Sequence, residues 1–142
     1  MAVPASTGPE LDPGRLADGA ARSVTVSGSL PSLAGACAVR VDSPGTIAIG
    51  GARWGLSTDV VVAPGATELP DGPLIVQVRD AHRQPDVQRT LSAVGAGSVV
   101  VEWGWPSPPG RRTDALPTID ARGWSRPGAV AVTEVLRRAG WD

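Results

Sequence analysis

The sequence predicts an α/β domain, a three-layer sandwich in which helices cover both faces of a mostly parallel β-sheet. Three strand-like apolar runs, at residues 74–78, 87–94 and 99–101, alternate with helix-like segments. Strands separated by helical segments imply right-handed βαβ units, and such units build a parallel sheet that is covered on both faces. The length of 142 residues is close to that of one domain, so one hydrophobic core is expected.

The first part of the chain contains a tail, a helix and several strands. Residues 1–10 are rich in Pro, Ser, Thr and Gly without periodicity, which predicts a flexible tail before a single domain over residues 11–142. Asp12 as an N-cap and Pro13 at the first helical position predict a short helix. Residues 24–26 and 37–41 alternate as strands, and residues 46–51 fit a strand or extended loop. Residues 56–64 fit a strand over 59–62 or a short helix.

The second part carries the clearest elements. The near-continuous apolar run 74–78 is typical of a central strand, and residues 119–121 form a weaker strand that leads into a helix over 127–139. Ser125 is available as the cap of that helix, Pro127 lies in its first turn, and Arg137 and Arg138 lie in its last turn before Gly140. These signals make it the best-defined element.

Charge and cysteine content exclude several classes of function. The net charge of -1 and the absence of a long arginine run argue against a nucleic-acid partner. The longest apolar stretches fall far short of the roughly 20 residues that cross a bilayer, and no signal peptide is recognisable, so a cytoplasmic chain is expected. The lone Cys37 at the start of a strand indicates a buried, inert thiol. No metal site and no cofactor are predicted.

Candidate functional residues follow the predicted strands. In open parallel sheets, ligands bind at the carboxyl ends of the strands, so the segments 79–83, 102–106 and 122–127 should meet at one edge. Ser125 at a helix N-terminus could hold an anion there. The candidate ligand or interface residues are Arg79, Asp80, His82, Arg83, Glu102, Trp103, Trp105, Ser125 and Arg126.

These same segments resemble a known family. The run 73–83, which ends in Arg-Asp-Ala-His-Arg, is followed by the run 99–106, which ends in Glu-Trp-Gly-Trp-Pro, and then by the turn 121–126. In this order and spacing they resemble the C-terminal domain of glycoside hydrolase family 3 β-N-acetylhexosaminidases of actinobacterial type. The resemblance covers most of residues 11–142. Residues 107–114 are longer and more polar than the family pattern and are predicted to form a surface loop.

The resemblance implies an accessory domain without the catalytic machinery. In that family an N-terminal (β/α)8 barrel supplies the catalytic Asp nucleophile and a His-Asp acid/base pair. Such a barrel needs about 250 residues, so a chain of 142 residues cannot contain it. No catalytic residue can be assigned to this chain, and activity of the chain alone is not expected.

Each candidate residue also has a purely structural interpretation. A lone His82 without a companion His or Cys is more often a hydrogen-bonded structural residue than a proton carrier. Asp80 at a strand end commonly caps the next helix or pairs with an adjacent Arg. Glu102 with Trp103 and Trp105 resembles a carbohydrate platform, but packing in the core or at a domain interface is the favoured role of these tryptophans. Trp141, near the terminus, is predicted to be the most exposed Trp.

Three hypotheses follow for the function. In the first, the chain is an accessory domain that packs against a barrel domain or a second copy of itself, through an apolar patch around Trp103 and Trp105. In the second, it is a small carbohydrate-binding or glycoside-hydrolysing protein, with an amino sugar as the possible ligand, that uses Arg79, Asp80, His82 and Glu102. A phage or scaffold structural protein is the third.

Overall fold

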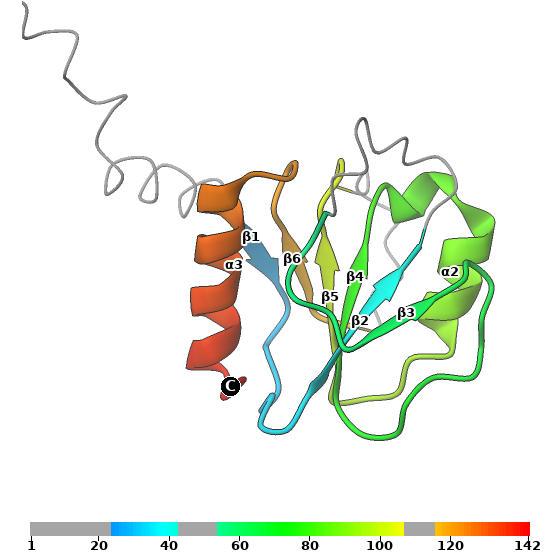
Figure 1. Ribbon diagram of the computed structural model, residues 1–142, viewed down its shortest axis with the longest axis horizontal. Helices are drawn as coiled ribbons and strands as arrows, with labels where there is room; N and C mark the ends of the chain where they lie inside the picture. Colours follow the sequence, from blue (N-terminus) through cyan, green and yellow to red (C-terminus); the bar gives the residue numbers. More distant parts are fainter. Residues whose placement is uncertain (1–23, 43–53, 107–115) are drawn as a thin grey trace, which may run out of the picture.

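The computed structural model describes residues 24–42, 54–106 and 116–142, and within them a six-stranded sheet forms the centre of the fold (Figure 1). The strand order is β1-β6-β5-β4-β2-β3. The elements are β1 (Thr25–Ser27), β2 (Cys37–Val41), β3 (Val60–Val62), β4 (Leu74–Val78), the 3-10 helix η4 (Ala81–Arg83), α2 (Pro85–Ser92), β5 (Val99–Glu102), β6 (Thr118–Asp120) and α3 (Arg126–Arg138). The predicted tail at 1–10, the helix from Asp12, the strand or loop at 46–51 and the loop at 107–114 lie outside the described residues.

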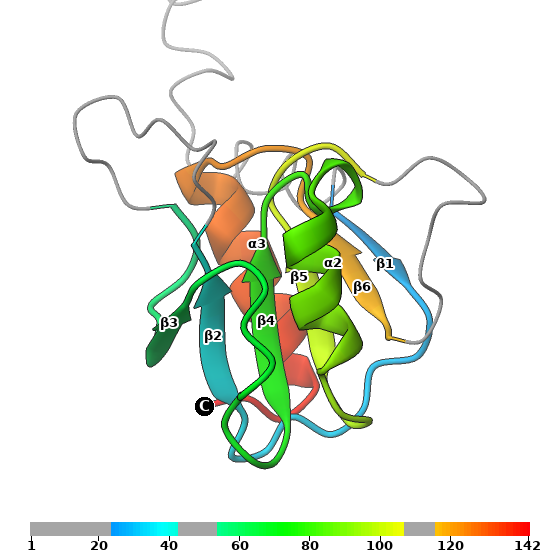
Figure 2. The same cartoon turned by 90° about the vertical axis from the view of Figure 1, so that its right-hand side faces the viewer.

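The predicted α/β sandwich with a mostly parallel sheet is confirmed. β3, β2, β4, β5 and β6 run parallel to one another, and β1 pairs antiparallel with β6 at one end of the sheet. The views in Figures 1 and 2 place α3 on one face of the sheet and α2 on the other. Within the described residues, each face of the sheet is covered by a single α-helix.

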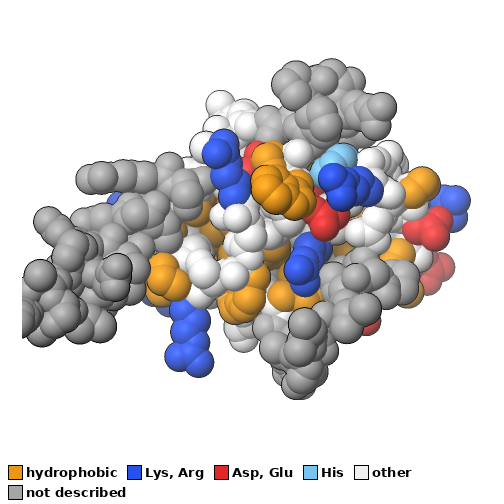
Figure 3. Space-filling view, turned by 90° about the horizontal axis from the view of Figure 1, so that it is seen from above, with side chains coloured by type: hydrophobic (Ala, Val, Ile, Leu, Met, Phe, Trp, Pro, Cys, Tyr) orange, Lys and Arg blue, Asp and Glu red, His pale blue; other side chains and the backbone are white. Residues whose placement is uncertain are grey.

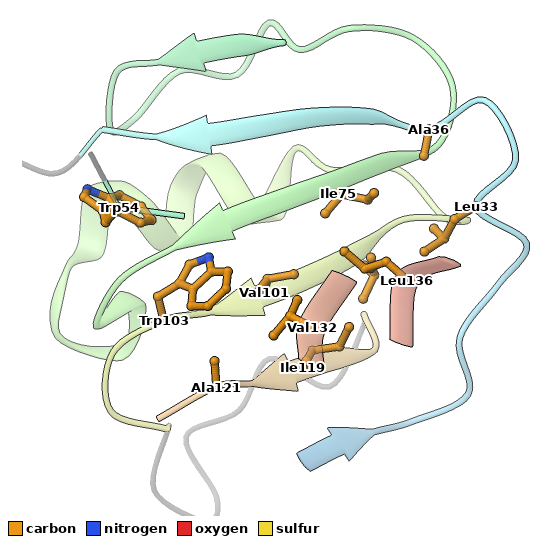
Figure 4. Packing of buried hydrophobic residues seen from close by; sticks show 11 residues of the cluster. Leu33, Ala36, Trp54, Ile75, Val101, Trp103, Ile119, Ala121, Val132 and Leu136 are labelled. Carbon is orange, nitrogen blue, oxygen red and sulfur yellow. The ribbon is translucent and has the colours of Figure 1, made fainter. Parts of the chain in front are cut away.

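The central strand β4 is buried along its whole length, which explains its continuous apolar sequence. Successive side chains of a strand point to opposite faces, so β4 contributes to two separate cores. Ile75 packs with Val132 and Leu136 of α3, in the cluster drawn in Figure 4. Leu74, Val76 and Val78 pack instead with Val87 of α2. Gln77, on the α3 face, is the polar exception in this strand and is fully buried.

The prediction of a strand-like run over 87–94 is wrong, because most of this segment belongs to helix α2. Pro85 stands at the first helical position, where its missing N–H costs nothing. Val87 and Thr90, three residues apart, are the buried residues of the helix and therefore share its inner face. The apolar residues are thus spaced for a helix that covers the sheet. The ambiguous stretch 56–64 contains a strand, β3.

Helix α3 agrees with its prediction. Ser125 is the N-cap, and its Oγ accepts a hydrogen bond of 3.0 Å from the backbone N–H of Gly128. Arg137 and Arg138 lie in the last turn, where positive charge is favourable to the helix dipole. Neither this helix nor any other described one has the length and apolar character needed to cross a membrane.

Candidate functional site at the strand-end edge

The three segments that follow β4, β5 and β6 meet at one edge of the sheet, as the strand order requires. They surround a shallow hollow of about 200 Å³, here called the strand-end hollow, which is lined by Arg79, Asp80, Trp103, Gly104, Trp105, Arg122 and Gly123. This edge lies at the top of Figure 1. Figure 3 shows it from above, with basic and acidic side chains gathered around an exposed hydrophobic side chain. The predicted convergence of the strand-end segments is therefore present in the structure.

Glu102, the last residue of β5, has a buried carboxylate that connects the turns after β4 and β5. Its carboxylate accepts hydrogen bonds from the backbone N–H groups of Asp80 (2.8 Å), Ala81 (2.9 Å) and Gly104 (2.9 Å). Burial raises the pKa of Glu102 above its ordinary value, these three hydrogen bonds oppose the rise, and the charge of Asp80 adds to it. A carboxylate with these partners and 3% exposure holds the turns after β4 and β5 in place and does not face a ligand.

Asp80 adds a second connection between the same two turns. Its Oδ1 accepts a hydrogen bond of 2.7 Å from the backbone N–H of Trp105. Its backbone is left-handed, with φ of 52°, a conformation that Asp tolerates better than most residues. Asp80 precedes η4, but its side chain makes no capping hydrogen bond. The predicted structural role of Asp80 takes neither suggested form, helix cap or pair with an adjacent Arg, among the described residues; its carboxylate fixes the Trp105 backbone instead.

The two tryptophans after β5 have opposite environments. Trp103 is fully buried; its indole N–H donates to Gln77 Oε1 at 3.1 Å, and its ring makes an edge-to-face contact with Trp124 at 5.1 Å and 76°. The favoured interpretation of Trp103 as a core residue is confirmed, whereas its suggested part in an exposed patch or sugar platform is wrong. Trp105 has 69% of its surface exposed and is the most exposed Trp among the described residues, in place of the half-buried Trp141.

Two arginines line the strand-end hollow without an acidic partner. Arg79 is half-buried at the end of β4, and Arg122 is exposed after β6. Across residues 24–42, 54–106 and 116–142, the ion pair of the structure joins Arg89 to Asp86 on α2 at 3.6 Å, and neither Arg79 nor Arg122 has one. Their guanidinium groups remain available for a ligand or a partner.

The remaining predicted residues do not line the hollow. His82 lies half-buried in η4, and its Nδ1 is buried without a hydrogen-bond partner among the described residues. Arg83 and Arg126 are exposed, at the end of η4 and the start of α3. Ser125 uses its hydroxyl to cap α3, so it already occupies the Gly128 N–H that an anion would need. His82, Arg83, Ser125 and Arg126 are therefore outside the lining of the hollow, although Arg83 donates a backbone hydrogen bond of 3.0 Å to the carbonyl of Asp80.

Three residues that shape the site are absent from the predicted candidate residues, although the named segments 102–106 and 122–127 include two of them. Arg122 and Gly104 line the hollow, and Gln77 supports it from below by holding the Trp103 indole. Gln77 had a detectable signal, since a polar residue inside a continuous apolar strand must be hydrogen-bonded when buried. A Cβ on Gly104 would overlap with the carboxylate and the backbone N of Asp80, so only glycine fits between the two turns. Such an approach cannot be deduced from local sequence.

The surroundings of Cys37 disfavour the reactive thiolate, as expected for an inert thiol. Burial and the neighbouring Asp59 carboxylate raise the pKa of the thiol above 9.0. Its place at the start of β2 is as predicted, although it is half-buried rather than fully buried. Within the described part of the chain, no three His, Cys, Asp or Glu side chains are grouped so as to hold a metal ion.

Comparison with known proteins adds no relative to this description. No family model matches the chain, and neither the curated proteins nor the solved structures contain a significant match.

Proposed function

We propose that this chain is a non-catalytic accessory domain, related to the C-terminal domain of family 3 β-N-acetylhexosaminidases, whose strand-end edge docks on a (β/α)8 barrel domain. One observation carries the non-catalytic part of the proposal. Three carboxylates lie at this edge: Asp80, Glu102 and Asp120, the last residue of β6 and the register partner of Glu102. Glu102 and Asp120 are buried, at 3% exposure each, and Glu102 and Asp80 accept hydrogen bonds from backbone N–H groups. Retaining glycosidases need two free carboxyl groups roughly 5 to 5.5 Å apart around a sugar ring, and this edge offers no such pair.

The exposed residues of the same edge support a docking role. Trp105 is 69% exposed and Trp124 is 39% exposed, and Arg79 and Arg122 flank Trp105 around the hollow. Trp and Arg are the residue types most enriched at binding hot spots, because each offers a large contact area together with polar groups. The order and spacing of the segments 73–83, 99–106 and 121–126 are the basis for choosing a family 3 barrel as the partner.

The catalytic part of the proposal is tested by hydrolysis. The purified chain is incubated with 4-nitrophenyl N-acetyl-β-D-glucosaminide, and the Glu102→Gln and His82→Ala variants serve as controls for contaminating enzyme. No turnover is expected from any of the three proteins. Turnover by the unaltered chain that either substitution abolishes would overturn the proposal and make this edge an active site.

The docking part is tested by sedimentation velocity with a separately produced family 3 barrel domain. A complex is expected with the unaltered chain, and Trp105→Ala should weaken it at least about tenfold, the usual effect of removing a hot-spot Trp. Val130→Ala is the matched control, because Val130 is also exposed, at 50%, but does not line the strand-end hollow. A chain that pairs only with itself, or a complex equally strong with Trp105→Ala, would contradict docking on a barrel through this edge.

A further inference from the structure

The strand-end hollow combines three kinds of chemistry within a small volume. Arg79 and Arg122 supply two guanidinium groups, Asp80 supplies a carboxylate whose Oδ1 already accepts from Trp105 N, and Trp105 supplies an exposed aromatic ring. The lining therefore carries two positive charges against one negative charge. A volume of about 200 Å³ is below the size of drug-like pockets and fits a single small ring or group.

The backbone around the hollow includes residues in the left-handed conformation. Among the described residues, two non-glycine residues have positive φ, Asp80 at 52° and Arg122 at 57°, and both line the hollow. Gly123, the next residue, has φ of 113°. A left-handed arginine is unfavourable, and such residues cluster at binding sites, where the surrounding structure holds them. Here the exposed Arg122 and the exposed Trp105 both line the hollow.

We infer that the strand-end hollow is a binding site for one acidic sugar residue, a pyranose that carries a carboxylate. The carboxylate would lie with the guanidinium groups of Arg79 and Arg122, whose N–H donors match its two oxygens. The apolar face of the ring would lie against Trp105, and the second oxygen of Asp80 would accept a hydroxyl. This inference goes beyond the docking role, because the chain binds the small molecule alone.

Other ligand classes use the lining less completely. A simple anion would leave Trp105 unused and would meet the negative charge of Asp80. A neutral sugar would leave both guanidinium groups without a counter-charge. A nucleic acid would need a longer basic surface than two arginines in a chain of net charge -1. An acidic sugar is the class that gives a partner to each of the lining side chains.

The experiment is an NMR titration of the ¹⁵N-labelled chain with methyl β-D-glucuronide, methyl β-D-glucoside and sodium acetate in turn. The indole N–H signal of Trp105 is identified from its absence in Trp105→Phe. With the glucuronide we expect this signal to shift, with a dissociation constant on the order of 1 mM, as a small and partly exposed site allows. The glucoside and acetate should each bind at least about tenfold more weakly, because each lacks half of the contacts.

Variants locate the binding. Arg79→Gln and Arg122→Gln should each weaken glucuronide binding about tenfold, the effect of one charge-assisted contact. Arg138→Gln, at the end of α3, removes the same charge from an exposed position away from the hollow and should leave the affinity unchanged. Near-ultraviolet circular dichroism, which detects the Trp103–Trp124 contact, verifies that each variant is folded.

Several results would overturn the inference. Equal affinity for glucuronide and glucoside would exclude a carboxylate site, and acetate that binds as tightly as glucuronide would reduce it to a simple anion site. No shift of the Trp105 signal in the folded chain, or an equal effect of Arg138→Gln, would exclude the hollow. The docking role uses the same exposed residues but is tested separately, by the hydrolysis and sedimentation experiments.

Discussion

Replacing Gln77 with leucine should remove a large part of the stability of the fold, because the Gln77 side-chain amide makes hydrogen bonds to three neighbouring residues. Gln77 is fully buried in β4. Its Oε1 accepts from Trp103 Nε1 at 3.1 Å and from the backbone N–H of Leu56, and its Nε2 donates to Thr58 Oγ1 at 3.1 Å. Leucine has a similar size but offers no acceptor, so the main effect of Gln77→Leu is the loss of these hydrogen bonds.

The magnitude follows from counting the groups left without a partner. Thr58 keeps its donor bond to the Leu56 carbonyl at 2.7 Å, so it loses only an acceptor role. The Trp103 and Leu56 N–H groups both lose their acceptor, and a buried unsatisfied donor costs about 1–3 kcal/mol. The expected loss is therefore about 2–6 kcal/mol, in the lower half of that range if water reaches the half-buried Leu56. Domains of this size have a free energy of unfolding of about 5–15 kcal/mol.

The assay is urea unfolding followed by tryptophan fluorescence, with the free energy of unfolding taken from the midpoint and slope. Ser92→Ala is the control, since the exposed Ser92 hydroxyl bonds only to the Gln88 carbonyl in its own helix, and it should change stability by less than about 0.5 kcal/mol. In a Trp103→Phe background the indole donor is absent, so Gln77→Leu should cost about 1–3 kcal/mol less there. A loss below about 1 kcal/mol in the unaltered background would refute the reasoning.

The remaining predictions concern the two turns, a helix cap and the thiol. The pKa of Glu102 is raised in the fold, so its contribution to stability is full below the ordinary value of 4.5 and is lost as pH rises through the folded pKa. The free energy of unfolding of the unaltered chain should therefore fall between about pH 4 and 7, and that of Glu102→Gln should not show this fall. A rise in stability of the unaltered chain over this range would contradict the prediction. Gly104→Ala should cost about 1–3 kcal/mol and weaken glucuronide binding, measured by urea unfolding and NMR, because its Cβ displaces Asp80. Ser125→Ala should cost about 1 kcal/mol in thermal or urea unfolding, and no loss would mean that the Gly128 N–H finds another acceptor. Cys37 should react with iodoacetamide at pH 8 more slowly than free cysteine, and Asp59→Asn should speed the reaction; equal rates would count against the raised pKa.

Local patterns were sufficient to predict most of the fold. The continuous apolar run of β4 and the cap, proline and terminal arginines of α3 each gave elements close to those observed. The error at 87–94 arose because a short apolar segment can be read as strand or helix. Its resolution depended on Pro85 and on the burial of Val87 and Thr90 against the sheet. Burial against another element is a tertiary property, so it was not available from the segment itself.

The site was predictable only as a location. Parallel strand order brings the segments after β4, β5 and β6 together, so the edge itself could be predicted. Which side chains remain exposed there could not, because Glu102 accepts from the N–H groups of Asp80 and Ala81 and Asp80 accepts from that of Trp105, each in the opposite turn. Those partners lie more than 20 positions away in the chain. No short-range pattern encodes them.

The turn after β5 places Trp103 in the core and Trp105 on the surface. Residues two positions apart would share a face if β5 continued, and both indoles would then lie in the core or both outside it. β5 ends at Glu102, and Gly104 allows the chain to pass against Asp80, whose carboxylate then holds the Trp105 backbone N–H at 2.7 Å. Trp103 is turned toward Gln77 and Trp124, and Trp105 is left outside next to Arg79 and Arg122. The buried carboxylate of Glu102 and the glycine at 104 thus hold the exposed edge in place, and their substitution should affect recognition through the positions of Asp80 and Trp105.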